Sequence, residues 1–200
     1  VKIHTDCPLR FGPMSIRGEI ATMIVDTLTT GISRVKQGLK DRIQLRVAAR
    51  NMLIWNLNGQ RVAKPVRGWW INRQSWIPGM GKKKCTACKI GLVMIGRYGL
   101  AGATDSNGDE NRPLLRRTLR YGPKTACPVD GCRSVSAGGQ AGSSILESHY
   151  ESRAPLGVIV EHLFEEHKWA VVRIDNWLAE LAGTTVAAAK KEVAKLPEPY

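Results

Sequence analysis

The sequence is short of acidic side chains. Its 200 residues include 30 Lys and Arg but only 17 Asp and Glu, which gives a net charge of +13. The deficit lies in residues 1–150, with 24 basic and 9 acidic side chains, whereas residues 151–200 carry 6 basic and 8 acidic ones. A basic body followed by a slightly acidic tail predicts a polyanionic partner for the first part and a protein partner for the second.

Long apolar segments are also missing. No uninterrupted apolar run approaches the 18 or so residues that a membrane-spanning helix needs. The beginning, Val1-Lys2-Ile3-His4, has no apolar core of the kind found in a signal peptide. We therefore expect no membrane partner and a cytoplasmic location.

Motifs for enzymatic chemistry are scarce. The sequence contains neither a paired-carboxylate motif for two-metal catalysis nor a glycine-rich loop for phosphate binding. Only four histidines are present, and His162 and His167 are five positions apart. On a straight helix that spacing separates two side chains by about 140°, too far to reach one metal from one face. These absences predict that the protein is not an enzyme.

Cysteine is rare too, but its distribution is informative. Four of the five cysteines form two close pairs, Cys85 with Cys88 and Cys127 with Cys132, separated by 38 residues. Two such pairs can supply four tetrahedral thiolate ligands, so we predict a structural Zn²⁺ held by all four. A disulfide and a redox-active Cys-x-x-Cys are the alternatives; five cysteines in 200 residues and the lack of a thioredoxin-like βαβ context disfavour them.

The segment between the pairs suggests a hairpin. Residues 90–95 are a continuous apolar run typical of a strand, and residues 118–121 could pair with it. Two cysteine knuckles at one end of a hairpin resemble the zinc-ribbon class of nucleic-acid-binding proteins. In size and in its single central cysteine cluster, the chain is also loosely similar to the small zinc-finger subunits of minimal CRISPR effectors. The first resemblance covers about 50 residues and implies structural zinc, and the second implies contact with DNA or with a guide–target duplex.

The fold class predicted from these patterns is α+β. Residues 1–66 form a basic helical region, with one amphipathic helix from Ser15 to Gly31 and a second ending at Gly59. Residues 67–133 combine a loop rich in Trp and Lys with the zinc-ribbon-like module. Residues 134–150 have the composition of a flexible linker, and residues 151–200 predict a three-helix bundle.

Basic and aromatic residues are interleaved in a way that suits nucleic acid, because aromatic rings stack on bases while cations hold the phosphates. Arginines recur every four residues along the second helix, which could also be an ordinary solvated face. The tryptophans before the first knuckle could equally be core residues. The candidate nucleic-acid contacts are Arg42, Arg46, Arg50, Arg67, Trp69, Trp70, Arg73, Trp76, Lys82, Lys83, Lys84, Arg116, Arg117 and Arg120.

The last 50 residues predict helices that begin at Pro155, cover residues 171–182 and start again after Thr184 or Thr185. The pattern around Leu178–Gly183 resembles a helix-turn-helix, but Glu192 occupies a position that this motif fills with an apolar residue. We therefore expect these helices to dock on other protein subunits.

Taken together, the sequence predicts a non-enzymatic, zinc-stabilised nucleic-acid-binding subunit of a larger nucleoprotein complex. One alternative is a transcription regulator or antiterminator of a phage or mobile element, with a carboxyl-terminal helix-turn-helix. Another is a structural protein of the ribosomal type.

Overall fold

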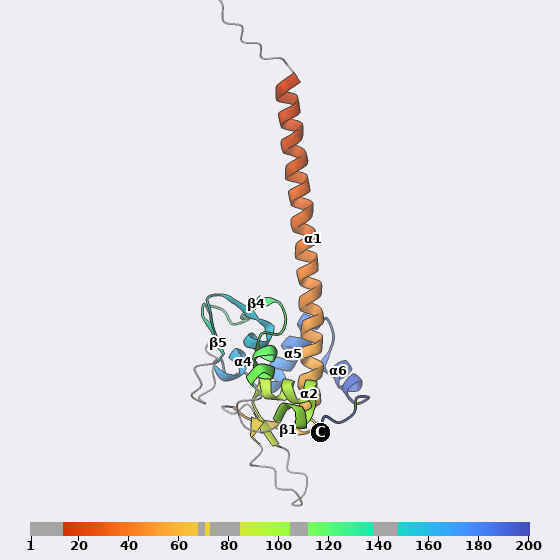
Figure 1. Ribbon diagram of the computed structural model, residues 1–200, viewed down its shortest axis with the longest axis vertical. Helices are drawn as coiled ribbons and strands as arrows, with labels where there is room; N and C mark the ends of the chain where they lie inside the picture. Colours follow the sequence, from red (N-terminus) through yellow and green to blue (C-terminus); the bar gives the residue numbers. More distant parts are fainter. Residues whose placement is uncertain (1–13, 68–70, 73–84, 105–111, 138–147) are drawn as a thin grey trace, which may run out of the picture. The chain divides into compact units, whose positions relative to one another are not determined.

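A computed structural model describes residues 14–67, 71–72, 85–104, 112–137 and 148–200 (Figure 1). The described chain is rich in helix and has a few short strands, in keeping with a mixed α+β class. It divides into two compact units, residues 1–42 and 43–200. Within the described residues, no helix is both long and apolar enough to cross a membrane.

The first helix is longer than predicted. α1 runs from Met14 to Gly59 without interruption, so the predicted break at Gly31 is wrong, whereas the predicted end at Gly59 is confirmed. A glycine inside a helix costs about 1 kcal/mol relative to alanine, which the hydrogen bonds of the flanking turns can offset. Gly31 is not among the described glycines with positive φ, so its backbone continues the helix.

The strands are short and form three small sheets. β1 (Ala63–Pro65) and β2 (Ile71–Asn72) flank β3 (Cys85–Ala87), with β1 parallel and β2 antiparallel to it. β4 (Lys124–Ala126) pairs antiparallel with β7 (Arg153–Pro155), and β5 (Val135–Ala137) pairs antiparallel with β6 (Ser148–Tyr150). The segment predicted to be a flexible linker therefore contains two paired strands. Its residues 138–147 lie outside the described residues.

The predicted hairpin between the cysteine pairs is wrong. Residues 90–95, predicted as the first strand, belong to α2 (Lys89–Thr104). Residues 118 and 119 of the predicted second strand belong to α3 (Arg112–Leu119). A short, continuous apolar run fits a buried helix as well as a buried strand. Here the run is buried on every side, because Leu92, Val93, Met94 and Ile95 are each at most 1 % exposed. The zinc-ribbon architecture is consequently not confirmed.

The centre of the second unit is α4 (Leu156–Glu165), in which all ten residues are buried. It packs against β5, α2, α3, α5, β4 and β7, so most of the core is built around it (Figure 1). α5 (Val171–Ala182) and α6 (Val186–Val193) follow, and Gly183 ends α5 in a left-handed conformation while the Thr185 hydroxyl caps α6. The three helices lie where the sequence predicted them. A self-contained bundle is not confirmed, because α4 packs mainly on the rest of the unit.

Glycines allow the helices of this core to approach closely. A side chain added at Gly96 of α2 would lie 1.7 Å from the carbonyl oxygen of Trp55 in α1. One added at Gly157 of α4 would lie 2.2 Å from the carbonyl oxygen of Thr118 in α3. Real Cβ atoms do not come so near a backbone oxygen, so backbone-to-backbone packing at both crossings requires glycine.

Candidate metal centre

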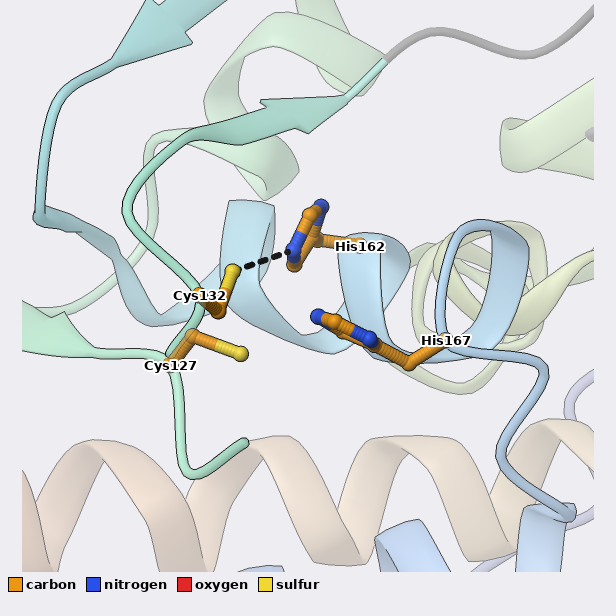
Figure 2. A group of neighbouring side chains, drawn as sticks. All are labelled: Cys127, Cys132, His162 and His167. Carbon is orange, nitrogen blue, oxygen red and sulfur yellow. Dashed lines mark hydrogen bonds between the residues drawn. The ribbon is translucent and has the colours of Figure 1, made fainter. Parts of the chain in front are cut away.

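Two of the cysteines lie in the turn between β4 and β5. The sequence Cys127-Pro128-Val129-Asp130-Gly131-Cys132 folds back on itself through a hydrogen bond from the Cys132 amide to the Val129 carbonyl, 3.2 Å long. Gly131 occupies a positive φ of 75°, which favours glycine. The turn brings the two thiols to the same side of the loop (Figure 2).

The two histidines come from the end of α4. The helix ends at Glu165, and beyond it the His167 amide donates to the His162 carbonyl over 3.2 Å, five residues back. Lys168 then adopts a positive φ of 55°, and the Trp169 amide returns to the Leu163 carbonyl. This turn wraps the chain around the helix end, so the His162 and His167 rings meet edge to face with centroids 4.7 Å apart. The prediction that they cannot share a metal assumed an unbroken helix and does not hold for this geometry.

Together these residues form the Cys2His2 cluster, namely Cys127, Cys132, His162 and His167. One ligand atom from each lies within 4.8 Å of the others. The Cys132 sulfur is 3.3 Å from Nε2 of His162 (Figure 2). In a tetrahedral zinc site, with bonds of 2.3 Å to sulfur and 2.0–2.1 Å to nitrogen, that edge is about 3.6 Å. The four side chains therefore fit one metal ion with only small movements.

One ring nitrogen of the cluster lacks a protein partner. Nε2 of His167 is buried and has no hydrogen-bond partner among the described residues. Burial raises the pKa of the Cys127 thiol to about 11, and a hydrogen bond with Cys132 adds to the shift, while the Val129 backbone opposes it. A cation at the centre would give the imidazole nitrogen a partner and favour the thiolate over the thiol. The surroundings of the cluster therefore suit a bound cation.

The spacing of the four residues was a signal in the sequence. Four residues separate the cysteines and four separate the histidines, and both gaps lie within the ranges of Cys2His2 sites, two to four and three to five. Two features hid the match: the 29 residues between Cys132 and His162, and the assumption that the histidines lie on one straight helix. Whether the two histidines can share a metal ion depends on where α4 ends, and residue spacing does not reveal where a helix ends.

The structure does not bring the four predicted thiolate ligands together. Cys85 lies in β3, in the middle of its sheet, and its thiol donates to the Val62 carbonyl over 3.8 Å. Cys88 lies immediately before α2, where its sulfur accepts from the Gly91 amide at 3.4 Å. Burial raises the pKa of Cys88 well above its usual value, and the Glu161 carboxylate adds to the shift. Both cysteines are buried core residues with protein hydrogen bonds.

A buried polar network joins α4 to other helices of the core. The Lys89 ammonium donates to the Asp175 carboxylate, which also accepts from Asn56 at 2.7 Å and Gln60 at 3.1 Å. Burial lowers the pKa of Lys89, and Asp175 opposes that shift. Glu161 accepts from the Ile90 amide at 3.0 Å, and burial raises its pKa to about 7. These contacts tie α1, α2, α4 and α5 together.

Some of the residues predicted to contact nucleic acid form hydrogen bonds or ion pairs with other residues of the chain. Nε of Arg46 donates to the Ala182 carbonyl at the end of α5, and Arg50 forms an exposed ion pair with Glu192 at 2.9 Å. Arg67 donates to carbonyls of Phe164, Lys168 and Trp169 and lies over the Phe164 ring. These three arginines therefore have structural partners.

The remaining candidates divide into two groups. Arg42, Arg116, Arg117 and Arg120 are exposed. The others lie outside the described residues: Trp69, Trp70, Arg73, Trp76, Lys82, Lys83 and Lys84.

Comparison of the chain with protein-family models, with curated proteins and with solved structures finds no significant match. The function must therefore be inferred from the chain's own residues.

Proposed function

We propose that the Cys2His2 cluster holds a structural Zn²⁺ ion and that the protein is a non-enzymatic, nucleic-acid-binding subunit of a larger nucleoprotein complex. The convergence of the four ligand atoms within 4.8 Å of one another carries this proposal. Two thiolates with two imidazoles are a common ligand set for structural zinc, and four protein ligands leave no open position for a substrate water. The ion would fasten the turn after β4 to the core helix α4.

The charge around the turn supports the nucleic-acid part of the proposal. Three exposed basic residues adjoin the cysteines: Lys124 in β4, Arg133 directly after Cys132, and Arg153 in β7 opposite Ala126. The Arg153 guanidinium donates to the Lys124 carbonyl at 2.9 Å, which holds these two residues together. Arg116, Arg117 and Arg120 add three exposed cations at the end of α3. Cations on a rigid, metal-fastened loop suit phosphate binding.

The protein-docking part of the proposal rests on α5 and α6. Every residue of α4 is buried in its own unit, so within residues 151–200 the later helices provide the accessible surface. Val172 on α5 is 63 % exposed. An apolar side chain that remains accessible on a helix suits contact with another subunit.

Metal content tests the first part. Zinc-supplemented wild-type protein is expected to contain one Zn²⁺ per chain by elemental analysis, and Cys127→Ser and His167→Gln are expected to lose it. The double variant Cys85→Ala/Cys88→Ala removes the other pair of thiols and serves as the matched control, which should keep its zinc. Zinc that survives Cys127→Ser, or disappears from the control, would contradict the assignment.

Binding to nucleic acid tests the second part. We expect Lys124→Glu/Arg133→Glu to weaken binding to labelled DNA and RNA oligonucleotides about tenfold or more at low salt, while zinc content stays unchanged. The logarithm of the wild-type affinity should fall with the logarithm of salt concentration by about 0.7–0.9 for each phosphate contact. An affinity that is independent of salt would exclude this function and leave the metal assignment intact.

A helix-turn-helix regulator remains the second candidate, because only Gly183, Thr184 and Thr185 separate α5 from α6 and the turn contains a left-handed glycine. Lys190 and Lys191 are the exposed cations of α6. Loss of sequence-specific duplex binding in Lys190→Glu/Lys191→Glu would favour this candidate. Unchanged affinity in that variant would favour the subunit.

A further inference from the structure

An apolar stripe runs along the first part of α1 and has no partner among the described residues of its unit. It consists of Ile24, Leu28, Ile32, Val35 and Leu39, whose exposed fractions lie between 54 % and 73 %. Its members recur at intervals of four, four, three and four residues, so the pattern repeats after 11 residues. A repeat of 11 residues corresponds to about 3.67 residues per turn, close to the natural period of a helix. The stripe therefore stays on one face.

The opposite face of this helix segment is polar apart from the exposed Met23. Thr22, Asp26, Ser33, Gln37 and Lys40 are all exposed, and the Gln37 amide donates to Asp41 at 2.7 Å on that side. A helix with one apolar stripe and one polar face gains most of its stability from covering the stripe. The stripe is thus a contact surface for another molecule, its occupant.

We propose that the occupant is the same stripe of a second copy of this chain, arranged antiparallel. The distribution of the cations supports this direction. The end of the segment carries Arg34, Lys36, Lys40 and Arg42 with Asp41, whereas residues 22–30 carry Asp26 alone. A parallel pair would place the four cations beside their own copies. An antiparallel pair centred between Gly31 and Ile32 places them opposite residues 29, 27, 23 and 21, none of which is charged.

The same alignment matches the apolar residues. With residue numbers summing to 63, Leu28 lies opposite Val35, Ile24 opposite Leu39, and Ile32 opposite Gly31 of the other copy. Neither Gly31 nor Gly38 has an atom within 4 Å of where a side chain would begin, so each leaves space for a branched residue of the other helix. Apolar residues therefore face apolar residues or glycine along the stripe.

A lipid surface fits the stripe less well. Helices that lie on membranes combine aromatic anchors with a polar face rich in Lys and Arg. Residues 22–42 contain no aromatic residue, and their polar face carries Asp26 and Asp41 as well as cations. A typical stable interface buries about 800 Å² on each partner, which is more than one five-residue stripe provides. The dimer should accordingly dissociate at micromolar concentration.

Sedimentation of the full-length protein over about 1–200 µM tests the proposal. The wild-type mass is expected to rise from 22.0 kDa toward twice that value. Ile32→Glu should remain monomeric throughout, whereas Ser33→Glu, which places the same charge on the polar face one residue away, should dimerise like the wild type. A wild-type protein that stays monomeric, or an Ile32→Glu variant that still dimerises, overturns the proposal. Binding of monomeric wild type to vesicles would assign the stripe to lipid.

Disulfide crosslinking tests the direction. Equal amounts of Leu28→Cys and Val35→Cys should give a crosslinked dimer when mixed and oxidised, and neither variant should do so alone. In the antiparallel pair, residue 28 and its own copy are seven residues apart along the axis, about 10 Å, beyond the reach of a disulfide. Oxidised wild type controls for the native cysteines. Crosslinking of either variant alone would show a parallel pair.

Discussion

At the scale of single residues, the cluster depends on atoms that protons and metal ions compete for. Each thiol must lose its proton to bind a metal, and burial raises the pKa of Cys127 to about 11. We therefore expect metal affinity to fall as pH falls, with about two protons released per ion near neutral pH. Competition against a chromophoric chelator between pH 5.5 and 8 measures this dependence. An affinity that does not change over this interval would mean that the thiols are not ligands.

The Lys89–Asp175 pair makes a second prediction at this scale. Both side chains are buried, and Asn56 and Gln60 donate further hydrogen bonds to the Asp175 carboxylate. Replacing only Asp175 with alanine leaves a buried ammonium without a counter-charge, which costs about 3–5 kcal/mol. Urea denaturation should show this loss in Asp175→Ala. The double variant Lys89→Met/Asp175→Leu removes both charges and should recover most of the stability, and failure to recover would indicate that the network matters more than charge balance.

At the scale of elements, the close crossings are the sensitive points. A methyl group at Gly96 would lie 1.7 Å from the Trp55 carbonyl oxygen and force α1 and α2 apart. Gly96→Ala should therefore lower the free energy of unfolding by at least about 1–3 kcal/mol. Gly102→Ala is the matched control, because Gly102 lies in the same helix as Gly96 and an added methyl group would meet only Cβ of Tyr98, at an ordinary 3.7 Å. This control should be neutral or stabilise by about 1 kcal/mol; equal losses in both variants would argue against the crossing.

The elements also show what the sequence could predict. The end of α1 at Gly59 and the three helices of residues 156–193 follow from spacing, a helix cap and a left-handed glycine, all of which are local signals. Residues 90–95 were misassigned because a run buried on all sides has no periodicity to read. The prediction at Gly31 was wrong for a different reason. Glycine is a strong local signal for the end of a helix, but here the flanking helical turns continue through it.

The candidate site follows the same division. Cys127 and Cys132 were recognised from their spacing within one turn. Their partners come from the end of a helix 30 residues later, where the choice between a straight helix and a wrapped turn depends on a backbone hydrogen bond between His167 and His162. Cys85 and Cys88 have the more regular spacing, yet the structure buries both of them in the core. Spacing identified residues of types that can bind a metal, and tertiary packing determines which of them lie close together.

At the scale of the whole molecule, removing the metal should loosen one region and leave the rest folded. α4 is buried among apolar side chains that do not depend on the ion, unlike the helix of a small zinc finger. Chelation should therefore increase amide hydrogen exchange in residues 124–137 while α4 and α2 stay protected. Mass spectrometry of peptides from holo and chelated protein distinguishes this outcome from global unfolding, which would raise exchange in α4 equally.

The cluster joins residues from different stages of synthesis. On a growing chain the turn at Cys127–Cys132 is complete before α4 exists, and the second half of the ligand set arrives only once His167 has been added. Until then the nascent chain carries two pairs of thiols and no complete ligand set, Cys85 with Cys88 and Cys127 with Cys132, and either pair could capture an ion or be oxidised. Burial of Cys85 in β3 and of Cys88 directly before α2 would remove the first pair from that competition, so loading of the cluster with an ion would depend on the order in which the core closes during translation.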